Sequence, residues 1–191
     1  PFAGCAFVIV ANPGSDGVNS NIRVGKITKF DPGNFELFGG VAIRLTDPVV
    51  FSGTSSRVGK AFTIKTYSTR VGLPIIFKLE SSPGVGPARS FTTTVANAWE
   101  EFTIDFNGEG SGSFPTITLI VDDGVTGEGG DNFTVHIDDI NQIDSTSVSA
   151  DLHMVYNFDA PNTTYTLTDF GDARLSDGVG PLDKRGVTDV G

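Results

Sequence analysis

The sequence predicts an all-β protein, an antiparallel two-sheet β-sandwich of the jelly-roll type with a C-terminal strand extension. Three observations carry this prediction. Val, Ile, Thr and Phe are frequent, whereas runs of strong helix formers are few. The 191 residues include 24 Gly and 10 Pro, which divide the chain into short segments. Several of these segments alternate apolar and polar residues with period two, as a sheet with one buried and one wet face requires.

The first predicted strands lie in the N-terminal third. Residues 6–11 are an apolar run, and residues 23–30 alternate before the turn at 31–34. Residues 41–45 follow the pair Gly39-Gly40, which marks another turn.

The predicted strands of the middle third are the most regular. Residues 60–68 alternate apolar and polar side chains over most of their length. Residues 74–79 end before the turn Ser82-Pro83-Gly84, and residues 90–95 follow it. Alternating patterns this short favour half-buried strands.

Further strands are predicted at 100–106, 116–121 and 133–137, with the Gly-rich stretch 108–112 after the first of them. Nowhere is the helical period sustained, which excludes a parallel βαβ fold.

The region after Gln142 has a different composition. We expect a domain at 1–142, a small, polar linker at 143–151 and an extension at 152–191. The extension contains two strand-like segments, 154–158 and 165–167. Its residues 170–181 can be laid over residues 2–13, which suggests the start of a repeat.

Composition excludes several classes of function. A net charge of −10 argues against nucleic acid as a partner, and the longest apolar run is far too short for a membrane span. The single cysteine, Cys5, excludes an internal disulfide, and two histidines give little basis for a zinc site. We expect both Cys5 and His136 to be structural.

No catalytic pattern emerges from the carboxylates. A glycosidase needs two carboxylates that face each other across a cleft. Glu100 and Glu101 are adjacent, so on a strand they point to opposite faces. Motifs for a serine nucleophile or a phosphate loop are absent from the sequence. The chain is therefore predicted not to be an enzyme.

Several segments, read in order, resemble a carbohydrate-binding-module-like β-sandwich repeat of secreted marine bacterial proteins. These segments are Val24-Gly25-Lys26-Ile27-Thr28-Lys29, Phe38-Gly39-Gly40-Val41-Ala42, Pro48-Val49-Val50-Phe51-Ser52, Phe77-Lys78-Leu79-Glu80, Thr92-Thr93-Thr94, Trp99-Glu100-Glu101-Phe102-Thr103-Ile104-Asp105-Phe106 and Ile137-Asp138-Asp139-Ile140. The resemblance implies a non-catalytic, extracellular or cell-surface module.

Modules of the resembled family open with a strand that this chain lacks ahead of Pro1. A sequence similar to that opening strand, Tyr156-Asn157-Phe158-Asp159, lies near the C-terminal end. A missing strand leaves backbone groups unpaired. The C-terminal strand could fold back into its own sandwich, insert into a neighbouring chain, or begin the next unit of a tandem array. The alternating apolar residues of this donor strand are Met154, Tyr156, Phe158, Tyr165 and Leu167.

A calcium site is one interpretation of the acidic turns, and surface solubility is the other. The resemblance implies a structural Ca²⁺ that joins Asp139 to Asp159 at the strand junction. Other candidate ligands are Asp138, Asp122, Asp123 and Asp131.

Sugar binding is possible through exposed rings, for which Tyr67 and Trp99 are the candidates, although Trp99 also fits a core position. Asn132 and Asn162 begin glycosylation sequons.

The leading hypothesis is a subunit or repeat of a filament or surface stalk, whose partner is itself. Strand complementation, together with calcium, would join the units. The alternative is a carbohydrate-binding module, with a polysaccharide as its partner and a polysaccharide-degrading enzyme beside it.

Overall fold

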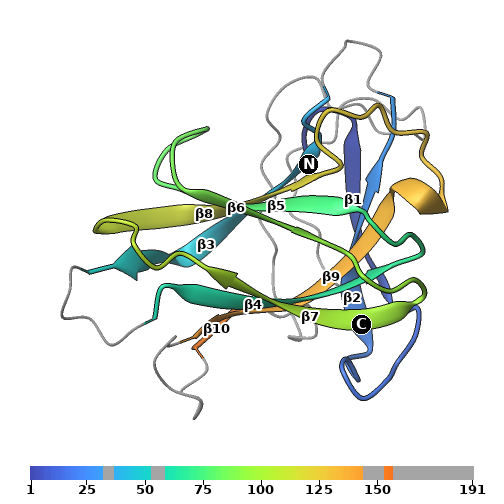
Figure 1. The fold of residues 1–191 in the computed structure, drawn as a ribbon, viewed down its shortest axis with the longest axis horizontal. Coiled ribbons are helices and arrows are strands. Elements are labelled where there is room, and N and C mark those ends of the chain that lie inside the picture. The colour runs from blue at the N-terminus through green and yellow to red at the C-terminus, as the bar shows by residue number, and fades with distance from the viewer. Residues whose placement is uncertain (32–36, 53–58, 144–152, 157–191) are drawn as a thin grey trace.

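The computed structural model describes residues 1–31, 37–52, 59–143 and 153–156 (Figure 1). These residues form ten strands and one short 3-10 helix, η1 (Asp131–Phe133). The strands are β1 (Cys5–Ala11), β2 (Arg23–Lys29), β3 (Gly40–Phe51), β4 (Ala61–Ser68), β5 (Pro74–Glu80), β6 (Ala88–Thr92), β7 (Ala98–Asp105), β8 (Gly112–Val121), β9 (Thr134–Ile143) and β10 (His153–Tyr156).

The strands make two antiparallel sheets that lie face to face (Figure 1). One sheet has the order β1-β2-β9-β4-β7, with β10 also paired to β9, and the other has the order β3-β8-β5-β6. This arrangement confirms the predicted all-β sandwich. Among the described residues, no helix is long and apolar enough to cross a membrane.

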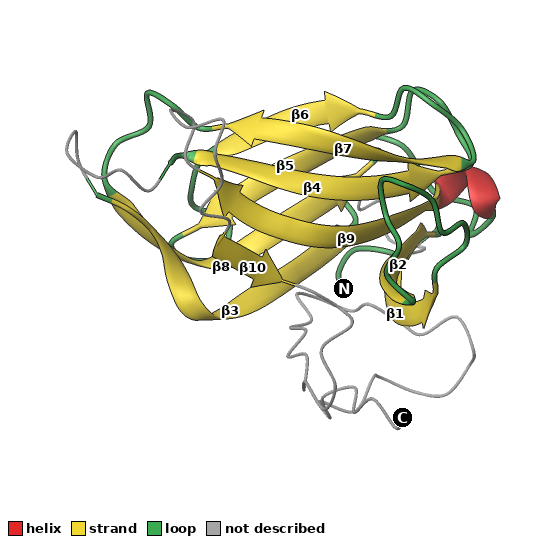
Figure 2. Ribbon diagram, turned by 90° about the horizontal axis from the view of Figure 1, so that it is seen from below, coloured by secondary structure: helices red, strands yellow, loops and turns green. Residues whose placement is uncertain are grey.

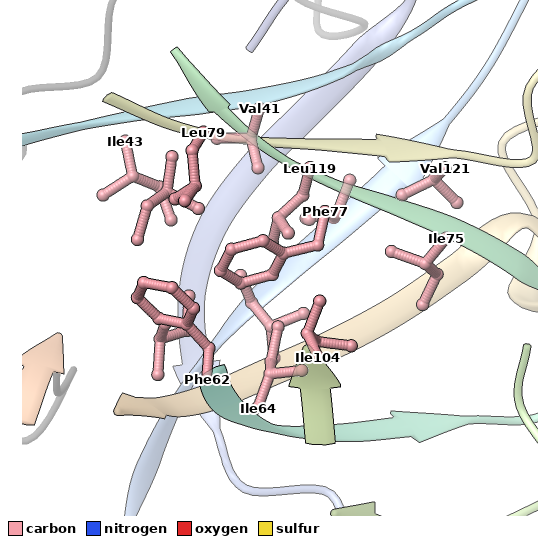
Figure 3. Close-up of a cluster of buried hydrophobic side chains, with 14 of the residues drawn as sticks. Val41, Ile43, Phe62, Ile64, Ile75, Phe77, Leu79, Ile104, Leu119 and Val121 are labelled. Atoms are coloured by element: carbon pink, nitrogen blue, oxygen red, sulfur yellow. The ribbon is translucent and has the colours of Figure 1, made fainter. Parts of the chain in front are cut away.

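The core lies between the sheets, where alternate residues of each strand meet. In Figure 3, Phe62 and Ile64 of β4 point toward Phe77 of β5, in the opposite sheet. The Phe62 and Phe77 ring centroids are 5.3 Å apart, and all three side chains are fully buried. Burial of a side chain of this size contributes about 1.5–3 kcal/mol, so this seam is a main source of stability.

A bulge in β9 explains why this strand is longer than predicted. The sequence predicts an end at Ile137, because Asp138 and Asp139 interrupt the apolar alternation. In the structure Lys65 pairs with Asp138 and Thr63 with Asn141, so two residues of β9 oppose one residue of β4. Asp139 takes a φ of +42° at this point. The extra residue restores the alternation, which puts both Ile137 and Ile140 in the core.

An irregularity in β3 has the same effect. The sequence predicts that this strand ends at residue 45, whereas the structure extends it to Phe51. The register with β8 shifts between Arg44 and Val49, a stretch that contains Pro48. Proline is tolerated at such irregularities because no hydrogen bond between the strands requires an N–H at that position. After the shift, Val49 and Phe51 face the core again.

The C-terminal strand lies on its own chain. β2 pairs with the first half of β9, and β10 pairs with Ile140, Asn141 and Gln142 of the second half. Figure 2 shows β10 beside β9. This pairing lies within one chain, and strand exchange between chains and a tandem array stay predictions. Most of the predicted linker at 143–151 lies outside the described residues, and the domain boundaries stay predictions.

Candidate functional site

The outer face of the β3-β8-β5-β6 sheet is hollowed into a groove. Because neighbouring side chains of β8 alternate, Ile117 and Leu119 enter the core whereas Thr116, Thr118 and Ile120 face outward. The register places Thr118 between Ala42 of β3 and Lys78 of β5. These residues form the floor of a first hollow of about 200 Å³.

Two aromatic rings form one wall of the first hollow. The Phe2 and Phe38 ring centroids lie 6.3 Å apart, and Phe38 is 49% exposed. Phe2 is held at the edge of the sheet by backbone hydrogen bonds with Gly40, at 2.9 and 3.2 Å. Residue 40 must be glycine, because a Cβ there would stand 2.0 Å from the carbonyl oxygen of Leu119. The wall is therefore fixed by backbone as well as by side chains.

The opposite wall is the turn between β5 and β6, which contributes Pro83 and Gly84. The Ser81 N–H donates to the Val85 carbonyl at 2.9 Å, and the Val85 N–H donates to the Ser82 carbonyl at 2.9 Å. These bonds close the turn tightly. The groove wall is preformed by them.

Polar groups of the first hollow come from β5 and β8. The Lys78 Nζ donates to the Gly84 carbonyl at 2.7 Å and lies 3.5 Å from Oε1 of Glu80. Thr118 is only 3% exposed, and within the described part of the chain its hydroxyl has no hydrogen-bond partner. A buried, unpaired hydroxyl is costly, so it marks a position where a ligand can supply a partner.

A second hollow of about 310 Å³ adjoins the first. The two hollows share Glu80 and Pro83. The remaining residues that line the second hollow are Arg44, Leu45, Ser81, Ser82, Pro115 and Thr116. The two hollows thus adjoin on the outer face of this sheet, and we call the pair of them the outer groove.

The expected aromatic platform on the other sheet is not open. Trp99 is 3% exposed, and its Nε1 donates to Asn12 Oδ1 at 2.9 Å. The loop that carries Asn12 also brings Gly14 against the Tyr67 ring, which lies 5.7 Å from the Trp99 ring. The burial of Trp99 argues against stacking of a sugar on this pair. The sequence could not show that a loop covers it.

The acidic pair on β9 is held by amides and a lysine. Oδ2 of Asp138 accepts from Nδ2 of Asn19 at 2.9 Å and from Nδ2 of Asn21 at 3.0 Å. Oδ2 of Asp139 accepts from Nζ of Lys65 at 2.7 Å. Burial raises the pKa of Asp138, and the hydrogen bonds from the two amides oppose that rise. This cluster secures the loop before β2 to the bulge in β9.

The other predicted calcium ligands lie elsewhere. Asp122 forms an ion pair with Arg70 at 2.7 Å, and Asp123 and Asp131 are exposed. Among the residues that the structure describes, no three carboxylate, histidine or cysteine side chains form a group that could hold a metal ion. Asp159 lies outside the described residues. The calcium site stays a prediction.

Some of the predicted donor-strand and glycosylation residues lie within the described residues, and the others do not. Met154 and Tyr156 belong to β10, while Phe158, Tyr165 and Leu167 lie outside the described residues. Asn132 is exposed in η1, and Asn162 lies outside.

Cys5 lies in β1 and is buried, whereas His136 lies in β9 and is half-buried. Cys5 is 2% exposed, and burial raises its pKa to about 12, so the thiol is not a nucleophile at neutral pH. Burial lowers the pKa of His136 to about 4, and its Nδ1 has no hydrogen-bond partner among the residues that the structure describes. Both residues are therefore neutral at pH 7.

Sequence reasoning did not single out the residues of the outer groove. The alternation in Lys78-Leu79-Glu80 and in 116–120 places these side chains on an outer face. It does not show that the face is hollowed, because the walls come from the distant residues Phe2, Phe38 and Pro83.

The fold and the groove define an antiparallel β-sandwich with a hollowed outer sheet face. No protein-family model matches the chain, and no curated protein is similar to it. Among solved structures, the chain is similar to the family 11 carbohydrate-binding module of a cellulosomal cellulase of Clostridium thermocellum. The TM-score is 0.37 and the identity 13%, over 74% of this chain and 84% of that one.

Proposed function

We propose that this protein is a non-catalytic, extracellular carbohydrate-binding module and that the outer groove binds a polysaccharide chain. The observation that carries the proposal is the pair of adjoining hollows, which combine an aromatic wall with a few buried polar groups. Small-molecule sites are typically apolar clefts in which a few polar groups fix the orientation of the ligand.

The chemistry of the groove suits a sugar. The exposed face of Phe38 offers an apolar surface for the C–H groups of a pyranose ring. Lys78, Glu80 and Thr118 supply donors and acceptors for hydroxyl groups. Because the two hollows join at Glu80, consecutive sugar units of one chain can occupy them.

The carboxylates of the groove support a binding role without catalysis. Among the described residues that line the groove, Glu80 is the sole carboxylate. Hydrolysis by the usual mechanism needs a second one across the scissile bond. An accessory role beside a polysaccharide-degrading enzyme is consistent with this composition.

Replacement of Phe38 tests the proposal. Affinity electrophoresis in gels that contain soluble polysaccharides, with cellulose and chitin pull-downs for insoluble ones, identifies a ligand of the wild-type chain. We expect Phe38→Ala to weaken binding about tenfold, which is ~1.4 kcal/mol. The control is Val71→Ala, which also removes an exposed apolar side chain. Equal affinity of Phe38→Ala and the wild type would place binding outside the outer groove.

Assembly through strand exchange is a second candidate function. It is favoured by one observation, the pairing of β10 with the distal half of β9, because the same edge can accept the strand of a neighbouring chain. In that case the chain would form filaments or stalks. Calcium, if Asp139 and Asp159 meet at the junction, would strengthen them.

A further inference from the structure

The first hollow of the outer groove has an unusual composition, which bears on the sugar that it holds. Apart from Lys78, Glu80 and Thr118, its walls offer apolar surface from aromatic, aliphatic and proline side chains. A plain hexose presents hydroxyl groups on every edge, so it would leave most of them without partners in such a hollow. An apolar substituent of a sugar matches these walls better.

The unpartnered hydroxyl specifies what the substituent must carry. Thr118 lies between Ala42, which has no polar side-chain atom, and Lys78, whose ammonium group is a donor. Neither neighbour can accept the hydroxyl proton. The backbone of β8 is engaged with β3 and β5 on its two sides. A ligand atom that accepts this proton, such as a carbonyl oxygen, would therefore complete the site.

A change of the Thr118 rotamer would bring the hydroxyl into the hollow. The side chain of Thr118 lines the hollow, while its Oγ1 is covered. Rotation about χ1 by about 120° moves the hydroxyl from one staggered position to another without movement of the backbone. The buried hydroxyl gains a hydrogen bond when the ligand arrives, and the binding free energy includes that gain.

Glu80 supplies the complementary acceptor. Glu80 is 7% exposed, lines the same hollow and forms an ion pair with Lys78 at 3.5 Å. A carboxylate can accept several hydrogen bonds, so an N–H of the ligand can be added to this ion pair. The hollow thus presents one donor, one acceptor and an apolar surface close together.

We propose, on the basis of the proposed function, that the first hollow recognises the acetamido group of an N-acetylhexosamine unit. The acetamido carbonyl accepts from the Thr118 hydroxyl, its N–H donates to Glu80, and its methyl group lies against Ala42, Ile120 and Phe38. The second hollow then holds the neighbouring sugar of the same chain.

Two matched probes test the choice of sugar. Chitohexaose and cellohexaose share a β-1,4-linked backbone and differ at C2, where one carries acetamido and the other hydroxyl. Titration calorimetry of the full chain should show chitohexaose bound at least tenfold more tightly. Saturation-transfer NMR with N-acetylglucosamine and N-acetylgalactosamine removes the dependence on linkage. The acetamido methyl should receive the strongest saturation in at least one of them.

Thr118→Val tests the residue. The substitution replaces an unpartnered hydroxyl with a methyl group, so the melting temperature should stay unchanged or rise. Affinity for the acetamido sugar should fall at least fivefold, and it should fall by a larger factor than the affinity for cellohexaose. Thr103→Val, on the exposed face of the other sheet, is the control.

Several results would overturn the inference. They are equal affinity for the two hexasaccharides, weak saturation of the methyl in both N-acetylhexosamines, and unchanged acetamido binding in Thr118→Val. Phe38-dependent binding of a polysaccharide that lacks acetamido groups would overturn it as well, yet would keep the proposed function. Absence of binding to any polysaccharide would overturn both the inference and the proposed function.

Discussion

Lys29 shows how a single buried charge can hold loops together. It is fully buried, and its Nζ donates to the carbonyl oxygens of Leu37 at 2.7 Å, Val121 at 3.0 Å and Asp122 at 2.7 Å. Burial lowers the pKa of Lys29, and the negative charges of Asp122 and Asp123 oppose that shift. The ammonium group thus satisfies three carbonyls from two segments that are distant in sequence.

Lys29→Met is expected to lower the free energy of unfolding by about 3 kcal/mol or more. The substitution leaves three carbonyl oxygens without their charged donor. Urea denaturation at pH 7 measures the change. Lys26→Met, on the same strand but half-buried, should cost much less, and equal losses for the two variants would contradict the proposed role of Lys29.

His136 is expected to make the fold sensitive to acid. Its pKa is about 4 in the folded state, because of burial and the nearby charge of Lys26, against 6.5 for the unperturbed group. Between these values the unfolded chain binds a proton that the folded chain does not, so stability rises with pH from about 4 to 6.5. Below pH 4 both states are protonated and the contribution is lost.

The wild-type protein should therefore lose about 1–2 kcal/mol more than His136→Gln between pH 7.5 and pH 4.5, with allowance for partial exposure of the ring. Urea titrations at both pH values give the comparison. Asp138 contributes in the opposite direction, because its raised pKa favours the folded state at low pH, and it is common to both proteins. Parallel losses in the two proteins would show that His136 is not responsible.

The bulge at Asp139 shows how one residue sets the facing of a strand. Without it, Ile140 and Gln142 would turn outward, because a shift of one residue exchanges the two faces of a strand. The bulge also places Asp139 within 2.7 Å of Lys65.

Deletion of Asp139 is expected to cost more than about 3 kcal/mol, since it removes Ile140 from the core. Asp139→Gly is the matched control. It keeps the extra residue and suits the positive φ, so it should lose only the ion pair with Lys65 and the hydrogen bond from Asn21 Nδ2, at 3.1 Å. Thermal unfolding distinguishes the two variants. Similar melting temperatures would mean that the bulge does not set the register.

The oligomeric state of the whole molecule depends on whether β10 pairs within its own chain or with a neighbouring chain. If β10 stays on its own chain, as in the structure, light scattering should give a monomer of about 20.1 kDa, with or without calcium. Large linear assemblies that are lost on deletion of 152–191 would instead show that the strand is shared between chains. Dissociation of such assemblies by a chelator would show that a metal ion stabilises the junction between chains.

The sequence by itself determined the elements that local patterns encode. Alternation in 62–67 and Gly-marked turns such as 82–84 predicted strands close to the observed ones, and the same alternation separated Phe62 and Ile64 from the outward Lys65. Period-two patterning is local, so it can be seen in the sequence. The patterns failed where Asp138-Asp139 and Asp47-Pro48 interrupt them, because pairing with a neighbouring strand carries β9 and β3 through the interruption.

Only the tertiary structure decided which surfaces are open. It buried Trp99 beneath the loop of Asn12, and it assembled the outer groove from Phe2, Phe38, Thr118 and the turn after Glu80. These residues are far apart in sequence. The depth of a groove depends on how sheets, loops and turns pack against each other, and no local pattern of residues encodes this packing.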